Sequence, residues 1–364
     1  MVLGIIALTG MVIYPLAGRF ADQHGARRML VAGLLIYGLA VTALSLTTAS
    51  LMQFYLTYAV VALGGCIAST PIFSKVIADW YDQGRGTALG ISAGLGNGIG
   101  AVVFPVMAAI VTAQYGWRMG YMAVGGLILV LGLPALLFLL RDAPRTAQPA
   151  IATGVEDSSD GLSLQQAWRL PRFWLIMLAI ASGAGCTTAI FSHVVPIMLD
   201  RGYSVELGTA VLSTFALTTS AWQVATGRLL DWIQTPRVVI PMVCMAILGL
   251  ALLQFGDGAA MMIVAGICLG IGMGSQYGAL PYFVARYFGT RAFGAIIGVM
   301  YSGVIAAQGV TPVLLDHGFD VYGNYRLAVI MAGMALATGA ILLLFLPGYT
   351  MASSNSENHQ PAPA

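Results

Sequence analysis

Residues 18–28 read GRFADQHGARR, and residues 227–237 read GRLLDWIQTPR. Both stretches begin with Gly-Arg, carry an aspartate four residues after the glycine and end on an arginine. Each follows an apolar run, and their glycines are 209 residues apart. A polar motif that recurs once in each half of the chain indicates a duplicated helical unit.

The two halves share a second motif. Residues 80–91, WYDQGRGTALGI, correspond to residues 286–299, RYFGTRAFGAIIGV. In each, aromatic residues end one predicted helix and an arginine opens the next, glycine-rich one. Arg85 and Arg291 are 206 residues apart, which is nearly the offset of the first motif. Two motifs at nearly equal offsets favour duplication over chance similarity.

The composition indicates that lipid is the main solvent of this chain. Hydrophobic residues make up 59% of the sequence and charged residues 8%, whereas an average soluble domain carries about 25% charged residues. A soluble fold of 364 residues could not cover its surface with so few charges. The net charge of +2 gives no sign of nucleic-acid binding. The four cysteines lie in apolar runs without C-x-x-C pairs, so they are predicted to be packing residues.

Eleven apolar runs are candidate membrane-spanning helices, which need about 20 residues each. They cover 2–17, 29–47, 52–79, 86–112, 117–140, 173–199, 205–230, 237–254, 259–287, 292–314 and 324–347. The predicted fold class is therefore an all-α polytopic membrane protein.

The longest polar interruption divides the chain into two bundles. Residues 1–140 are predicted to form an N-terminal bundle of five spans and residues 173–348 a C-terminal bundle of six. The Pro- and Ser-containing stretch 141–172 is predicted to be a linker, with a short interfacial helix at 163–170. The polar residues 349–364 are predicted to be a disordered tail.

The distribution of basic residues predicts the orientation in the membrane. If the loop at 18–28 is cytoplasmic, alternating spans put thirteen Lys and Arg residues on that side and three on the other. By the positive-inside rule, the linker and the C-terminal tail are cytoplasmic. We expect an integral protein of a bacterial inner (plasma) membrane.

The repeat also predicts an absent element. In the second half, a whole span at 173–199 precedes the span that ends at Gly227. In the first half, no span precedes the one that ends at Gly18. We therefore expect a twelve-span parent fold whose first helix is missing from this chain.

These features resemble the major facilitator superfamily. Its signature G-x-x-x-D-[RK]-x-G-x-R-[RK] is similar to the first motif at Gly18, Asp22, Gly25, Arg27 and Arg28. Gln23 departs from the signature, because a basic residue is usual there, and Gly227, Arg228 and Asp231 resemble the degenerate second copy. The resemblance covers the whole chain. It implies two pseudo-symmetric helical bundles and a secondary transporter that moves a small organic solute by alternating access.

A closer resemblance is to the monocarboxylate and oxalate/formate branch. It rests on residues 80–100, WYDQGRGTALGISAGLGNGIG, and residues 193–204, HVVPIMLDRGYS. The branch implies a carboxylate or other organic anion as cargo, with a coupled proton or counter-solute. However, Thr219 and Gln223 stand where animal-type porters carry Asp and Arg, and the span 292–314 lacks the basic residue of the exchangers. A drug or metabolite exporter with a neutral cavity is the alternative within the superfamily.

The resemblance implies a gating role for the two motif aspartates. Asp22 is expected to face the start of the 292–314 helix, whose N-terminal amides and positive dipole end favour a carboxylate. Asp231 is expected to do the same for the 86–112 helix. The two arginines that close the first motif would pair with Asp22 or with lipid headgroups. Such contacts exist only when the cytoplasmic side is closed, so they would bias alternating access. The alternative is a topology anchor without a gating role.

Polar side chains inside spans are candidates for the substrate cavity, because a charge in a bilayer costs at least about 2.5 kcal/mol. Lys75, the sole lysine, would either attract an anion from the cavity or extend its ammonium group to the membrane surface. The candidates are Lys75, Asn97, His193, Gln223, Gln276, Tyr277, Tyr301 and Gln308.

The alternatives for these residues are structural. Asn97, among glycines, fits packing and helix bending, and the amides and tyrosines fit hydrogen bonds between helices. His193 would relay protons or satisfy local hydrogen bonds. No paired carboxylates, metal motif or nucleophile with a base indicates an enzyme, and we expect no catalytic residue, metal or cofactor. A sensor would need a folded cytoplasmic domain, for which linker and tail are too short. We expect a monomer in the bilayer.

Overall fold

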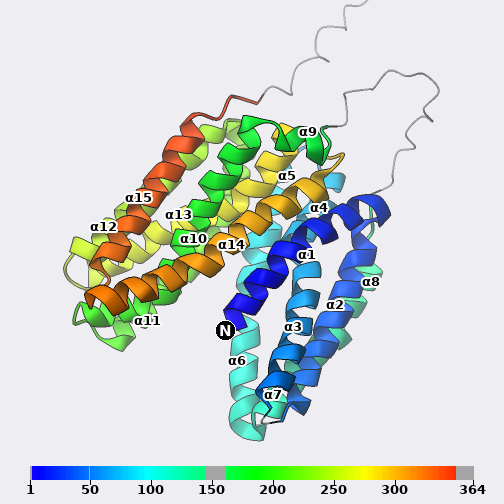
Figure 1. The fold of residues 1–364 in the computed structure, drawn as a ribbon, viewed down its shortest axis with the longest axis horizontal. Coiled ribbons are helices and arrows are strands. Elements are labelled where there is room, and N and C mark those ends of the chain that lie inside the picture. Colours follow the sequence, from blue (N-terminus) through cyan, green and yellow to red (C-terminus); the bar gives the residue numbers. More distant parts are fainter. Residues whose placement is uncertain (1, 49, 144–160, 350–364) are drawn as a thin grey trace, which may run out of the picture.

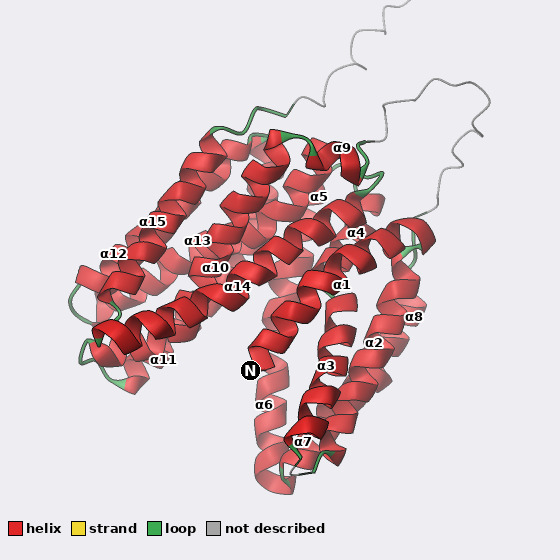
Figure 2. Cartoon of the chain, viewed as in Figure 1, coloured by secondary structure: helices red, strands yellow, loops and turns green. Residues whose placement is uncertain are grey.

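The structure is a computed structural model that describes residues 2–48, 50–143 and 161–349 of the chain. Figure 2 shows helices joined by short loops throughout these residues. Most of the predicted linker and all but the first residue of the predicted tail lie outside the described residues. One isolated antiparallel bridge joins Gly161 to Gly289.

The first bundle contains the predicted N-terminal spans. Its helices are α1 (Val2–His24), α2 (Ala26–Ala43), η1 (Leu44–Leu46), α3 (Leu51–Ile67), α4 (Thr70–Trp80), α5 (Arg85–Ile91), η2 (Ser92–Gly96), α6 (Asn97–Tyr115), α7 (Trp117–Leu127), η3 (Ile128–Gly132) and α8 (Leu133–Leu139). Here η2 and η3 are π-helical turns inside otherwise continuous spans.

The second bundle holds the longer helices and most of the buried apolar core. Its helices are α9 (Leu164–Trp168), α10 (Pro171–Asp200), α11 (Val205–Ile233), η5 (Pro236–Val238), α12 (Val239–Phe255), α13 (Ala259–Phe288), α14 (Phe293–Tyr322) and α15 (Arg326–Leu344). The short α9 is the interfacial helix predicted within 163–170, and a capping box between Ser163 and Gln166 begins it.

Ten helical stretches of the described chain are long and apolar enough to cross a membrane. The prediction of eleven also counted α11, which has 29 residues but carries several Thr, Ser and Gln side chains.

The first span runs further than predicted. Helix α1 continues through the polar residues to His24, and Gly25, at φ 93°, ends it.

The span predicted at 52–79 is broken in its middle. Helix α3 ends at Ile67, and α4 begins at Thr70. Pro71 lies in the first turn of α4, where it cannot donate an amide hydrogen and its ring would clash with the carbonyl four residues earlier. The hydroxyl of Ser69 donates to the Cys66 carbonyl at 2.6 Å, which satisfies one acceptor at the end of α3. The break therefore follows from Pro71.

The two bundles meet through two helix pairs. Helix α1 packs along α14, and α5 packs against α11. In Figure 1 the bundles converge where α9 lies and diverge toward the opposite end, where α6 and α7 stand apart from α11 and α12. We call the end that carries α9 the linker end.

Glycines allow both helix pairs to approach closely. A Cβ on Gly18 would overlap the Gly294 carbonyl, and one on Gly294 would crowd the Gly18 carbonyl. Gly86 and Gly227 are related to each other in the same way. Small residues at such crossings let helix backbones come into contact. The repeated glycines of the sequence therefore lie in the seam between the bundles.

The close contact of the glycine pairs lets us predict the effect of adding one methyl group at a glycine of the seam. Gly227→Ala would press a Cβ into the Gly86 carbonyl, and overpacking costs about 1–3 kcal/mol. The equilibrium constant for closing the linker end should therefore fall about 5- to 150-fold. The measurement is the distance distribution between spin labels at Arg28 and Arg291, in a background without native cysteines.

Gly126→Ala is the matched control, because nothing lies within 4 Å of a Cβ there. If both variants give the same distances, the glycine pair does not control the closed seam.

Candidate functional site

Asp22 bridges the two bundles at the linker end. Its carboxylate accepts hydrogen bonds from the amides of Gly294, at 2.9 Å, and Ala295, at 2.8 Å. Both amides belong to the first turn of α14, where backbone N–H groups lack partners within the helix and the dipole is positive. The contact expected from the motif is therefore present.

Asp231 makes the equivalent contact between α11 and α5. It accepts hydrogen bonds from the amides of Gly86, at 2.9 Å, and Thr87, at 2.7 Å, and from the Thr87 hydroxyl at 2.8 Å. These groups lie in the first turn of α5, inside the second motif, as the resemblance to the superfamily implies. We call the Asp22 and Asp231 bonds the two aspartate contacts.

Lys75 belongs to the linker end and not to the cavity lining. Its ammonium lies 3.1 Å from the Asp22 carboxylate and 2.9 Å from Asp79, and its side chain is 9% exposed. Asp79 is one helical turn away, so both carboxylates reach the same amine. The structure therefore pairs the lysine charge within the protein instead of directing it toward an anion in the cavity.

Other motif residues also lie near this end. The amide of Arg27 donates to Asp142 at 2.9 Å and its guanidinium to the Leu137 carbonyl at 2.7 Å. These bonds tie α2 to the end of α8. Arg28 and Arg228 are exposed.

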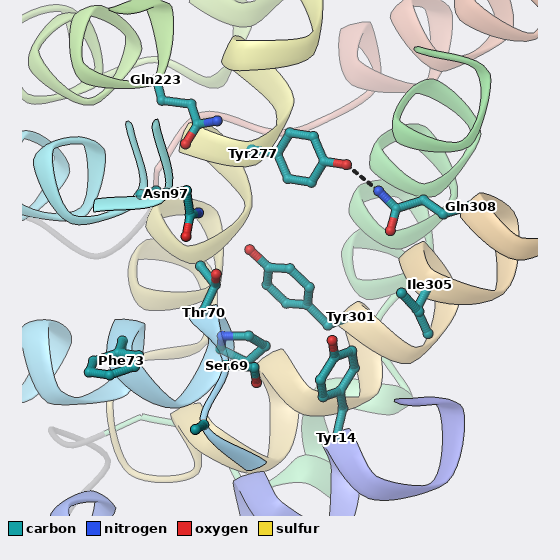
Figure 3. A pocket seen from close by; sticks show the side chains of 13 residues that line it. Tyr14, Ser69, Thr70, Phe73, Asn97, Gln223, Tyr277, Tyr301, Ile305 and Gln308 are labelled. Atoms are coloured by element: carbon teal, nitrogen blue, oxygen red, sulfur yellow. Dashed lines mark hydrogen bonds between the residues drawn. The ribbon is translucent and has the colours of Figure 1, made fainter. Parts of the chain in front are cut away.

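A cavity of about 400 Å³ lies between the bundles. Figure 3 shows its polar side chains pointing toward a common space from helices of both halves. The lining residues are Tyr14, Ala68, Ser69, Thr70, Pro71, Phe73, Ala93 and Asn97 from the first bundle, and Gln223, Tyr277, Tyr301, Ile305 and Gln308 from the second. None of these thirteen side chains is acidic or basic. The cavity offers neutral hydrogen-bonding groups and aromatic surfaces.

Five of the eight cavity candidates line this space: Asn97, Gln223, Tyr277, Tyr301 and Gln308. The amide nitrogen of Gln308 donates to the Tyr277 hydroxyl and, at 3.1 Å, to the Thr188 hydroxyl. The hydroxyls of Thr188 and Tyr277 are 3.2 Å apart. This network fixes one wall of the cavity.

Two polar atoms of the lining have no partner. The Gln223 Oε1 atom and the Tyr301 hydroxyl are shielded from water and form no hydrogen bond with the described residues. Both residues are 7% exposed. A buried polar group without a partner costs about 1–3 kcal/mol. Both atoms therefore keep an unused hydrogen-bonding capacity in residues that line the cavity.

The two remaining candidates lie elsewhere. Gln276 is 1% exposed and packs against Gly183 of α10. The Nε2 atom of His193 lies 2.8 Å from the Asp316 carboxylate, and its Nδ1 lies 2.8 Å from the Ala189 carbonyl. His193 therefore links α10 to α14 outside the cavity lining.

Tyr14, Ser69 and Thr70 also line the cavity, although they were not among the residues predicted to do so. The run Ser69-Thr70-Pro71 was the available signal, since a proline inside a span ends or kinks the helix and frees backbone groups. Tyr14 carries no such signal. It is placed by the packing of α1 on α14, where its ring meets Tyr301 edge to face at 6.2 Å.

A sequence model of the Major Facilitator Superfamily matches residues 1–312. The chain belongs to this superfamily. The probable L-galactonate transporter of Escherichia coli (strain K12) is 25% identical over 356 residues, 90% of this chain and 76% of that protein. Monocarboxylate transporter 12 of Rattus norvegicus is 23% identical over 370 residues, 94% of this chain and 76% of that protein.

A solved structure shares the fold. The superfamily transporter FucP of E. coli, in its outward conformation, matches with a TM-score of 0.70 at 16% identity. The match covers 94% of this chain and 89% of that one. The match to the family model makes this chain an integral membrane transporter of the superfamily, and the shared fold is one of two helical bundles.

The ion pairs of Lys75 predict a structural role for its charge. Lys75→Gln leaves two largely buried carboxylates without their cation, and removing one partner of a buried pair costs about 3–5 kcal/mol. We expect the melting temperature of the purified protein to fall by several degrees. Thermal unfolding in detergent would measure this.

Arg28→Gln serves as the control, because Arg28 is an exposed cation at the same end. Equal melting temperatures for both variants would show that the Lys75 pairs contribute nothing to stability.

Proposed function

We propose that this protein is a secondary active transporter that moves a small organic solute by alternating access, with the central cavity as its cargo site. One observation carries the proposal: side chains of both bundles line the same cavity. A movement of one bundle against the other would separate the lining residues of the two bundles and open the cavity to the other side of the membrane.

The two aspartate contacts are proposed as the gate of the linker end. Each joins a carboxylate of one bundle to the first amides of a helix in the other. Separation of the bundles at this end would break all of these bonds together. If the linker end is cytoplasmic, as the basic residues predict, this conformation faces outward.

The relatives favour an organic anion as cargo. L-Galactonate and monocarboxylates are the solutes that their names give. Coupling to a proton or exchange for a counter-solute, a monomeric state and a bacterial inner membrane belong to the same proposal. The second candidate is a drug or metabolite exporter, which the lack of charged side chains among the thirteen lining residues favours.

Removal of the gate charge should shift the conformational equilibrium. In Asp22→Asn and Asp231→Asn, charge-assisted bonds worth about 1.5–3 kcal/mol are weakened. We expect the population closed at the linker end to fall in both variants, while cargo binding persists. Spin labels at Arg28 and Arg291 report the population.

Asp82→Asn is the control, since the Asp82 side chain is 91% exposed. Loss of folding in Asp22→Asn, with no shift in the Asp231 variant, would favour a topology anchor over a gate.

Counterflow into proteoliposomes tests transport itself. A panel of carboxylates, sugars and amphipathic drugs should contain one class with saturable exchange. Tyr277→Phe removes the hydroxyl that joins Thr188 and Gln308, and we expect about a tenfold loss of affinity, as for one or two lost hydrogen bonds.

Tyr58→Phe is the control, because Tyr58 lies outside the cavity lining. No counterflow with any class, or equal losses in both variants, would contradict the proposed cargo site.

A further inference from the structure

The break between α3 and α4 places a helix N-terminus at the cavity. Helix α4 has 11 residues and begins at Thr70, and both Ser69 and Thr70 line the cavity. The N–H groups of a first helical turn point outward past the helix end. Together with the helix dipole they form a site that favours an anion.

The amides at this helix end are available to a ligand. Among the described residues, the amide hydrogens of Ser69 and Thr70 meet no acceptor. The next residue, Pro71, has no amide hydrogen, and the following amides of Ile72 and Phe73 donate to the Ser69 carbonyl. The Ser69 hydroxyl already donates to the Cys66 carbonyl. Two backbone donors and the Thr70 hydroxyl are therefore left for a ligand.

A second observation points to a ligand in the same cavity. Gln223 Oε1 and the Tyr301 hydroxyl, each in a residue more than nine-tenths buried, have no partner in the described chain. Figure 3 shows the Tyr301 hydroxyl pointing into the space beside Thr70 and Asn97. A carboxylate cannot donate to Gln223 Oε1, whereas a hydroxyl group of a ligand can.

The cavity lining has no cationic side chain that could bind an anion instead. Its thirteen residues include no Lys, Arg or His. Lys75, on the same helix as Thr70, is held by Asp22 and Asp79 at the linker end. The N-terminus of α4 is therefore the positive pole available to the cavity.

We propose that the cargo is a polyhydroxylated carboxylate. Its carboxylate binds at the N-terminus of α4, where it accepts hydrogen bonds from the amides of Ser69 and Thr70 and from the Thr70 hydroxyl. Its hydroxyl groups bond to Gln223 Oε1 and to the Tyr301 hydroxyl. The cavity volume of about 400 Å³ lies within the usual range for small-molecule sites. This inference rests on the proposed cargo site and names the class of solute it takes.

The first test compares ligands that share parts of this chemistry. Binding to the purified full chain is measured for aldonates (galactonate and gluconate), for alditols, which have the hydroxyls without the carboxylate, and for hexanoate, which has the carboxylate without the hydroxyls. We expect the aldonates to bind at least about tenfold more tightly than either partial ligand, since each lost set of bonds is worth a factor of this order.

Equal affinity of alditols and aldonates would overturn the carboxylate site, and equal affinity of hexanoate would overturn the hydroxyl site. If another class of solute shows counterflow while aldonates do not bind, the inference fails and the proposed transport function stands. If no solute shows counterflow, the proposed function itself fails.

The second test removes the backbone donor. Thr70→Pro deletes one of the two free amide hydrogens together with the Thr70 hydroxyl. It does so at the first helical position, where proline is well tolerated, and Ser69 already has the extended ψ of 167° that precedes proline. We expect aldonate affinity to fall about tenfold toward that of the alditols, with alditol binding unchanged. Thr70→Ala, which removes the hydroxyl and keeps the amide, should lose less.

Leu51→Pro is the matched control, because it places a proline at the first position of α3, away from the cavity. Gln223→Leu provides an independent variant: it should weaken aldonates and alditols about tenfold alike and leave hexanoate unchanged. If Thr70→Pro retains the full preference for aldonates, or if Gln223→Leu retains full affinity, the corresponding half of the site is wrong.

Discussion

The bond between an aspartate carboxylate and the first amides of a helix in the other bundle organises this molecule. It occurs twice, at Asp22 with α14 and at Asp231 with α5. Glycine pairs bring the helix backbones close enough for each carboxylate to reach its amides. Both contacts join the bundles at the linker end, where Figure 1 shows the two bundles converging.

Two titratable side chains inside the spans are likewise paired with carboxylates of the protein. Lys75 is paired with two carboxylates at the linker end, and His193 is paired with Asp316 outside the cavity lining. The cavity keeps only neutral side chains. A charged cargo in such a site depends on backbone dipoles for compensation, and the interruption of one span at Pro71 supplies them.

Much of this arrangement could be predicted from the sequence, because composition and repeats report solvent and symmetry. They indicated the membrane spans and the short helix at α9, and polar residues inside the spans indicated five of the cavity residues. Both aspartate contacts were implied by the resemblance to the superfamily. Which face of a helix meets the opposite bundle is decided by tertiary packing, so Gln276 and Tyr14 could not be assigned correctly. The pairing of Lys75 with Asp79 was visible at helical spacing, but its proximity to Asp22 needed the fold.

The glycine seam has a consequence for how this protein can diversify. At Gly18, Gly86, Gly227 and Gly294 the nearest contact is with a backbone carbonyl, a group that every sequence shares, whereas the cavity wall consists largely of side chains. The seam between the bundles and the wall of the cavity are thus determined by residues at separate positions. Substitutions in the cavity wall can change which solute binds while the seam between the bundles keeps its geometry. The same two-bundle fold can therefore serve many different solutes.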